Sequence, residues 1–151
     1  MRAGALLDSN VIIAILAEEH EHHAASLALL TADDSVPCAL AAHSIAEAYT
    51  TLTRRSDHAQ FRLTAEEAWA GLESVRAVTT LVGLTPPQAF DAVRAYAASG
   101  GIGSRLYDAL IGQAAVIYGI PVLITWNTQH MRGLFPELLV ATPASFLARR
   151  R

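Results

Sequence analysis

The feature that most constrains this chain is the alternation of short apolar runs with longer segments of helical pattern. The apolar runs lie at residues 4–8, 36–40, 77–84, 121–125 and 138–142. Short buried strands that alternate with helices are typical of a mostly parallel sheet covered by helices on both faces. In open sheets of this kind, ligands bind outside the carboxyl ends of the strands. Residues that directly follow the apolar runs are therefore the first candidates for a functional site.

Helix start signals support the same α/β interpretation. Helices are expected at residues 9–17, 21–32, 44–55 and 104–118, with a short helical turn at 128–134. Ser9 or Asn10 is a fitting N-cap for the first helix, and Ser44 is expected to begin the third. Two further helices start at capping boxes, Thr64 with Glu67 and Thr85 with Gln88, the second with Pro86 at its first position.

Composition indicates one ordinary domain over residues 1–151. Hydrophobic residues make up 52% of the chain and charged residues 17%, which is enough apolar material for a core. The single cysteine, Cys38, allows no intrachain disulfide, so a reducing cytoplasmic location is expected. We expect its thiol to be buried, as most free cysteines are.

No membrane-spanning or targeting segment is expected. Residues 109–131 carry no formal charge, but Gly119 and Pro121 break this run into a helix, a turn and a buried strand. Near the N-terminus, Asp8 interrupts the apolar run that a signal peptide would need.

Three acidic side chains are expected to meet at the carboxyl edge of the sheet. Asp8 ends the first apolar run, Glu47 lies early on the helix after the second, and Asp108 lies early on the helix before "PVLIT". Asn127 follows the end of that last strand. If the sheet is parallel, all four side chains can gather at one edge.

Each acid also has a purely structural explanation. Asp8 can cap the helix that follows it, and Glu47 has capping-box spacing from Ser44. Asp108 lies in a first helical turn, where a negative charge is favoured. Its neighbours in "LYDALI" are apolar, however, and an unpaired carboxylate is costly among them. A cation is therefore expected beside Asp108.

A divalent metal ion is the simplest source of that positive charge. The chain has no Lys, and Arg105 is the only Arg near Asp108 in sequence. Carboxylates that approach one another raise each other's pKa unless a cation offsets their repulsion. Hard oxygen ligands favour Mg²⁺ or Mn²⁺ over Zn²⁺. Such an ion can activate water and stabilise the charge that develops on a phosphate.

Four segments together carry a family resemblance. "LLDSNVI", "SIAEAYTTL", "LYDALIGQAA" and "LITWNTQHM", in this order and at this spacing, resemble the PIN-domain nucleases, especially the VapC-like toxins of prokaryotic type II toxin–antitoxin pairs. The resemblance runs over nearly the whole chain. It implies a three-layer α/β/α sandwich whose acidic pocket binds Mg²⁺ or Mn²⁺ and hydrolyses RNA phosphodiester bonds. The implied partners are an RNA substrate and a cognate antitoxin. The apolar region 60–99 resembles the helical part through which family members form homodimers.

The resemblance also assigns roles by position. Asp8, Glu47 and Asp108 match the three main acids of the family, which are catalytic and bind the metal. Asn127 matches a further ligand position where many relatives have Asp, and an amide is a weaker, uncharged ligand. The supporting positions that match are Ser9, Asn10 and Thr125.

Other signals carry weaker predictions. His130 lies near the expected site and either meets substrate phosphate or packs on the surface. His20, His22 and His23 could suggest zinc, but no Cys joins them and their spacing is not a closed ligand set, so a solvated helix face is expected. The run of Arg149, Arg150 and Arg151 is interpreted as a solvated tail, with contact to RNA or antitoxin as the alternative.

Several other functions that occur on similar folds do not fit this sequence. Receiver domains and haloacid-type phosphatases also place acids at strand ends, but they use a Lys, which this chain lacks. The net charge of −3 argues against a protein that holds nucleic acid by charge alone. A non-catalytic RNA- or protein-binding module, a housekeeping RNA-processing enzyme and a DNA nuclease remain alternatives.

Overall fold

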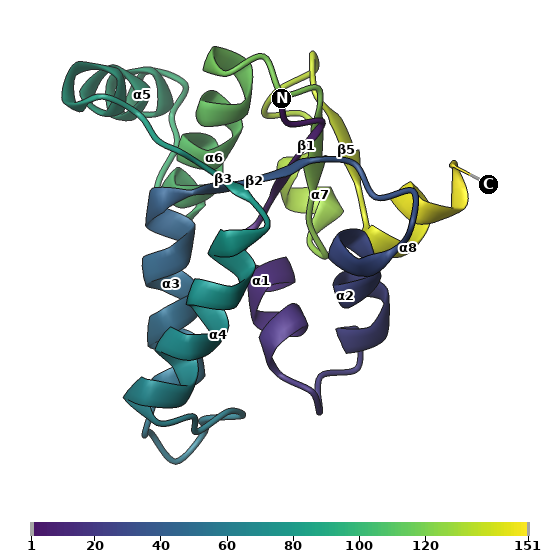
Figure 1. Ribbon diagram of the computed structural model, residues 1–151. Coiled ribbons are helices and arrows are strands. Elements are labelled where there is room, and N and C mark those ends of the chain that lie inside the picture. The colour runs from purple at the N-terminus through teal and green to yellow at the C-terminus, as the bar shows by residue number, and fades with distance from the viewer. Residues whose placement is uncertain (1, 151) are drawn as a thin grey trace.

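A single parallel sheet lies at the centre of the computed structural model, which describes residues 2–150 (Figure 1). Its strands are β1 (Ala5–Leu7), β2 (Cys38–Ala41), β3 (Thr80–Val82), β4 (Val122–Ile124) and β5 (Leu139–Ala141). The strand order is β3-β2-β1-β4-β5, and every neighbouring pair is parallel. In the centre, Leu6 of β1 lies opposite Ala39 of β2 and Leu123 of β4. The parallel sheet expected from the alternation of apolar runs is confirmed.

Helices connect the strands and cover both faces of the sheet. They are α1 (Ser9–Leu16), α2 (His23–Thr31), α3 (Ala42–Thr53), α4 (Ala65–Ala77), α5 (Pro86–Ala98), α6 (Arg105–Ile117), α7 (Thr128–Met131) and α8 (Pro143–Ala148). Side chains of α1 to α4 and of α8 pack on one face, and side chains of α6 and α7 pack on the other. This three-layer α/β/α arrangement confirms the fold class that the family resemblance implied.

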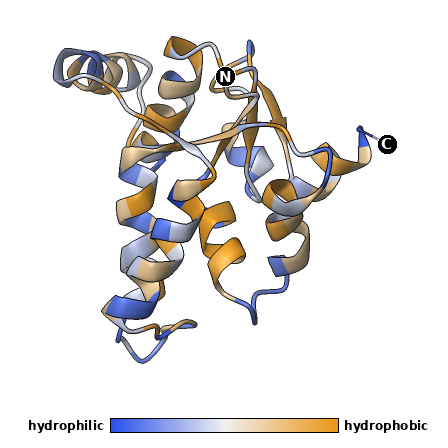
Figure 2. Cartoon of the chain, in the orientation of Figure 1, coloured by the Kyte–Doolittle hydropathy of each residue, from blue (hydrophilic) through white to orange (hydrophobic). Residues whose placement is uncertain are grey.

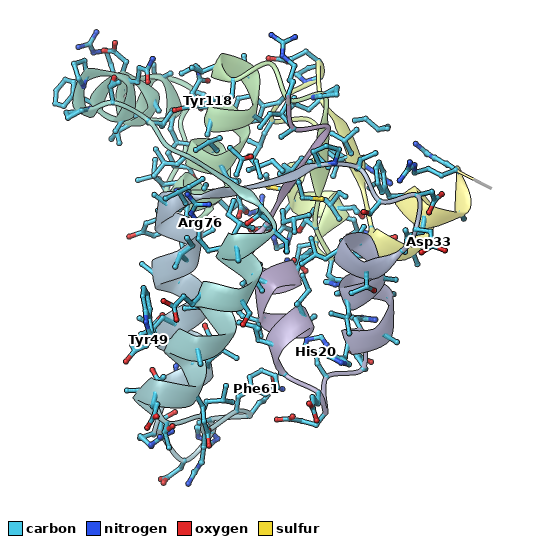
Figure 3. All side chains as sticks on the ribbon, in the orientation of Figure 1. His20, Asp33, Tyr49, Phe61, Arg76 and Tyr118 are labelled. Carbon is cyan, nitrogen blue, oxygen red and sulfur yellow. The ribbon has the colours of Figure 1, made fainter. Side chains whose placement is uncertain are left out.

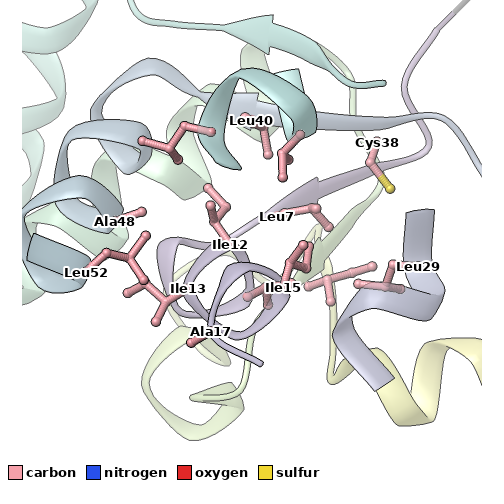
Figure 4. Packing of buried hydrophobic residues seen from close by; sticks show 14 of the residues in the cluster. Leu7, Ile12, Ile13, Ile15, Ala17, Leu29, Cys38, Leu40, Ala48 and Leu52 are labelled. Carbon is pink, nitrogen blue, oxygen red and sulfur yellow. The ribbon is translucent and has the colours of Figure 1, made fainter. Parts of the chain in front are cut away.

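Two hydrophobic cores lie on opposite faces of the sheet because successive strand residues point in opposite directions. Leu7 belongs to the core that surrounds α1, together with Ile12 and Leu40 (Figure 4). Leu6 belongs to the second core, against α6. After Ser9 and Asn10, helix α1 is apolar to its end, as Figure 2 shows, and it is enclosed by the sheet and by α2 and α3.

Cys38 lies in the core around α1, as expected for a free thiol. Its side chain is 2% exposed, and burial raises its pKa to about 11. A thiol held protonated in this way is a poor nucleophile at neutral pH.

Sequence signals predicted some helix ends correctly and missed others. The capping boxes at Thr64 and Thr85 are both present, so the expected starts of α4 and α5 are confirmed. The N-cap of α1 is Asp8, not Ser9 or Asn10. Helix α8 was not predicted, although it begins with a capping box between Thr142 and Ser145.

Helix α5 stands apart from both cores. None of its residues is buried, and it packs mainly against α6 (Figure 1). Its apolar side chains are therefore open to solvent, and Phe90 is 67% exposed. Within residues 2–150, no helix has the length and apolar character needed to cross a membrane.

The central strands create a switch point at the carboxyl edge of the sheet. The chain leaves β1 toward β2 on one side, whereas β4, on the other side of β1, is reached only after β3. Ligands bind at such a point in open α/β sheets. Asp8 follows β1 and Thr125 follows β4, so both residues lie there.

Candidate active site

Asp8 is held rigidly where β1 meets α1. The residue is only 7% exposed. Oδ1 accepts a hydrogen bond from the backbone N–H of Ser9 at 2.7 Å, which caps α1. Oδ2 accepts hydrogen bonds from Thr125 Oγ1 at 2.8 Å and from Asn10 Nδ2 at 3.3 Å. Asp8 is thus a helix cap and part of a polar network at the same time.

The predicted supporting residues form this network. Thr125 is fully buried, and its hydroxyl accepts hydrogen bonds from Asn10 Nδ2 at 3.0 Å and from the backbone N–H of Asn127 at 3.1 Å. Asn10 Oδ1 in turn accepts from the backbone N–H of Trp126 at 3.1 Å. The corner after β4 is therefore tied to the start of α1. The structure brings Ser9, Asn10 and Thr125 to Asp8.

The three predicted acids share one electrostatic environment. Burial raises the pKa of Asp8, even though its hydrogen bonds and the nearby His43 oppose the shift. The pKa of Glu47 is raised by burial and then by the charges of Asp8 and Asp108. The pKa of Asp108 is raised by burial and by Asp8, against the opposing effects of His130 and Arg105. These shifts are the ones expected for carboxylates from three elements that approach one another.

Glu47 does not take part in a capping box. Helix α3 begins at Ala42, with Ala41 as an N-cap that makes no side-chain hydrogen bond, because β2 leads directly into the helix. Ser44 was expected to begin this helix, and that expectation is wrong. Ser44 lies inside the first turn, where its fully buried hydroxyl has no hydrogen-bond partner among residues 2–150. The carboxylate of Glu47 is therefore not committed to the helix start.

His43 is a site residue that the sequence reasoning missed. Its Nε2 lies 3.7 Å from Glu47 Oε1, one helical turn away on α3. Burial lowers the pKa of His43, while a hydrogen bond to the backbone of Tyr107 and the charge of Asp8 act in the opposite direction. The signal that could have found it is its i, i+4 spacing from Glu47.

Asn127 lies at the edge of the site. Its backbone N–H is held by Thr125, but its side chain is exposed and does not cap α7. It lines a cavity of about 210 Å³ together with Trp126, Thr128, Gln129 and His130. Its role as a metal ligand stays a prediction.

The histidines after α1 do not form the solvated helix face that was expected. Helix α1 ends at Leu16, and the following turn places the His22 ring against that of Trp126, with centroids 3.8 Å apart. Trp126 Nε1 also donates a hydrogen bond to the buried Ser26 Oγ at 3.0 Å. These contacts fix the side chain of Trp126, and therefore the corner that holds Asn10.

The acids near the switch point offer carboxylate oxygens, the type of ligand that Mg²⁺ prefers. Across residues 2–150, no three His, Cys, Asp or Glu side chains are close enough together to hold one metal ion by themselves. Mg²⁺ is commonly held by one or two carboxylates and keeps several waters. Three acids with raised pKa values and no Lys to neutralise them are suited to such an ion.

Comparisons with known proteins agree with the fold. The family model described as "PIN domain" matches residues 5–132. VapC20 from Mycobacterium tuberculosis, a toxin that cleaves the sarcin–ricin loop, is 17% identical, with a TM-score of 0.61 over 79% of this chain and 86% of that chain. No match was found in the comparison with curated proteins.

Two further solved structures are similar over most of the chain. VapBC2 from Rickettsia felis, bound to a DNA fragment from its promoter, is 16% identical, with a TM-score of 0.61 over 90% of this chain and 96% of that chain. FitAcB from Neisseria gonorrhoeae is 19% identical, with a TM-score of 0.57 over 93% of this chain and 98% of that chain. At these identities, the structural likeness establishes a shared fold.

Proposed function

The chain belongs to the PIN domain family, and from this premise we propose that it is a metal-dependent endoribonuclease, the toxin of a toxin–antitoxin pair. The observation that supports the proposal is the electrostatic influence of Asp8 on both Glu47 and Asp108, which come from two other elements of the fold. Each of these carboxylates has a raised pKa, and no Lys neutralises them. A purely structural set of acids gains nothing from such mutual repulsion.

We propose that these three acids hold Mg²⁺ or Mn²⁺, with Asn127 as a further ligand. A bound divalent ion stabilises charge on a scissile phosphate and lowers the pKa of a bound water.

The protein side chains supply orientation and proton transfer. Hydrogen bonds from Ser9, Asn10 and Thr125 fix the carboxylate of Asp8. Its oxygens are therefore already oriented before a ligand binds. Glu47, whose side chain is 40% exposed, has a raised pKa that suits it to accept a proton at Oε1 or Oε2 from an attacking water.

Two side chains near Asp108 can contact the substrate phosphate. His130 and Arg105 both lower the pKa of Asp108, so they lie within electrostatic range of it. We assign His130 to contact with substrate phosphate. Its exposed position leaves the imidazole accessible to an RNA strand.

The named neighbours support the toxin assignment. VapC20 is a toxin that cleaves the sarcin–ricin loop, and VapBC2 is solved bound to a DNA fragment from its promoter. We therefore propose a cognate antitoxin as the protein partner of this chain.

We further propose that the chain is one domain and that it forms a homodimer. The family match ends at residue 132, but β5 pairs with β4 and α8 packs on α2, which joins the last described residues to the same fold. Met1 and Arg151 lie outside the described residues. The apolar, uncovered face of α5 supports a second copy of the chain as its partner.

The test is cleavage of single-stranded RNA and DNA of identical sequence by the purified protein. With Mg²⁺ or Mn²⁺ we expect RNA to be cut, and with a chelator we expect no cleavage. Equal cleavage of DNA would reassign the protein as a general nuclease. Binding of RNA without cleavage under any metal condition would favour the non-catalytic module.

A further inference from the structure

Two cavities lie side by side at the end of α3 that is remote from the sheet. The first has a volume of about 150 Å³ and is lined by Thr51, Arg54, His58, Ala59, Gln60 and Phe61. The second, of about 370 Å³, is lined by Glu19, His20, Glu21, Gln60 and Phe61. Gln60 and Phe61 therefore belong to both. Figure 3 shows His20 and Phe61 beside each other below α1, where their rings stack with centroids 5.9 Å apart.

The threonines of α3 differ in what their hydroxyls do. Thr50 Oγ1 donates a hydrogen bond to the carbonyl of Glu47, and Thr53 Oγ1 donates to the carbonyl of Tyr49, each at 2.8 Å. The hydroxyl of Thr51, which lines the smaller cavity, has no hydrogen-bond partner among the residues that the structure describes. It is free to donate to a ligand.

The arginines of the following loop differ in the same way. Arg55 donates to the carbonyl of Leu63 at 2.7 Å, and Arg62 donates to that of Ser56 at 3.2 Å, so both guanidinium groups hold the loop together. The guanidinium of Arg54 makes no hydrogen bond or ion pair within residues 2–150. The Arg that lines the smaller cavity is therefore the uncommitted one.

The smaller cavity is reached from the acidic site along one face of α3. Glu47 and Thr51 are four residues apart on α3, which places them on the same side of the helix, and Arg54 is the C-cap residue directly after the helix. Seven residues of helix correspond to a rise of roughly 10 Å. An RNA strand whose scissile phosphate lies at Glu47 can reach Arg54 within a few nucleotides.

The two loops around the cavities carry opposite charges that do not neutralise each other. The loop after α1 contains Glu18, Glu19 and Glu21, and the loop after α3 contains Arg54, Arg55 and Arg62. Between them, no ion pair forms in the described part of the chain. The carboxylate of Glu19 and the guanidinium of Arg54 thus make no ion pair on the two sides of Gln60 and Phe61, and Glu21 Oε1 lies 3.6 Å from His22 Nε2.

We propose that these cavities form a nucleotide-binding subsite for the RNA substrate, an inference that rests on the proposed nuclease function. The phosphate lies in the smaller cavity, where Arg54, Thr51 and His58 donate hydrogen bonds to its oxygens. The base lies in the larger cavity, where the carboxylates of Glu19 and Glu21 accept hydrogen bonds from an exocyclic amine. The subsite therefore selects a base that carries an amine, such as cytosine, over uracil.

The first test needs no catalysis and uses CMP and UMP, which differ at C4 by an amine against a carbonyl. In an NMR titration of the metal-free protein, CMP should shift the signals of residues 58–61 and bind about three- to tenfold more tightly than UMP. Glu19→Gln combined with Glu21→Gln should remove this preference. Equal binding of the two nucleotides, or no shift at these residues, would overturn the proposal.

The second test measures cleavage of an RNA by Arg54→Ala, with Arg2→Ala as the control. Both variants lose one positive charge. Arg2 precedes β1, at the end of the sheet opposite to the carboxyl edge where α3 begins. Arg54→Ala should raise KM about tenfold with kcat nearly unchanged, and should make log KM less dependent on log salt. If wild type is active and Arg54→Ala has an unchanged KM, the subsite is refuted. If wild type has no activity, the nuclease function is refuted, and the nucleotide titration alone decides whether the subsite exists.

Discussion

At the scale of single residues, the site combines acids that the sequence identifies with neighbours that it does not. Asp8, Glu47 and Asp108 could be predicted because each lies at a strand end or in an early helical turn of a parallel α/β chain. His43 was missed, although its i, i+4 spacing from Glu47 is visible in the sequence. Ser44 was misassigned as a cap, since backbone geometry at the end of β2 starts the helix earlier.

The raised pKa of Asp108 predicts how metal-free stability depends on pH. The folded protein holds a proton on Asp108 at pH values where the unfolded chain has lost it. Asp108 therefore favours folding most at acid pH, and its contribution falls as pH rises through the folded-state pKa. The melting temperature of Asp108→Asn should therefore rise relative to that of wild type as pH increases from about 4 to 7.

Melting curves at several pH values with and without Mg²⁺ check this prediction. Asp57→Asn, which removes an exposed acid from the loop after α3, is the matched control. Saturating Mg²⁺ should reverse the advantage of Asp108→Asn, since the ion stabilises the wild-type carboxylate. A difference in melting temperature between wild type and Asp108→Asn that stays constant over the whole pH range would contradict the raised pKa of Asp108.

At the scale of helices and strands, local signals predicted the elements better than their ends. The capping boxes of α4 and α5 are visible in sequence because both partners are side chains. Helix α1 is capped by Asp8, the same side chain that serves the site, so sequence spacing alone could not separate the two roles. The helix expected at residues 21–32 begins only at His23, because His22 lies in the preceding turn with its ring against Trp126, a contact that is distant in sequence.

Helix α5 carries the prediction at this scale. Its exposed Phe90 and Val93 should be buried in a homodimer, and light scattering at micromolar concentration should give the mass of two chains. Phe90→Ser should shift the protein to monomer. Leu139→Ser, the same kind of change on β5 at the opposite edge of the sheet, should not. A wild-type monomer, or a Phe90→Ser dimer of unchanged affinity, would contradict the assignment.

At the scale of the whole molecule, the three-layer arrangement requires that both faces of the sheet be covered. Leu6 and Leu7 are adjacent and fully buried, yet each belongs to a different core. Replacing either one with Ala should therefore lower the free energy of unfolding by a similar amount, about 2–5 kcal/mol. Urea denaturation of the two variants measures both values. A cost below about 1 kcal/mol for one of them would mean that its face is not packed.

The most direct test of the account is RNA cleavage in Mn²⁺ by wild type, Asp8→Asn and Asn127→Ala, with melting curves for all three. Asn is about as good an N-cap as Asp, and the loss of a buried charge offsets the loss of one acceptor oxygen, so Asp8→Asn should keep its melting temperature within a few degrees. Its cleavage rate should fall by orders of magnitude, because the site loses the charge that holds the metal. Asn127→Ala should lose less, since an amide contributes less electrostatic stabilisation than a carboxylate. Full activity of Asp8→Asn would contradict the mechanism, and lost activity with a collapsed melting temperature would leave Asp8 with only its structural role.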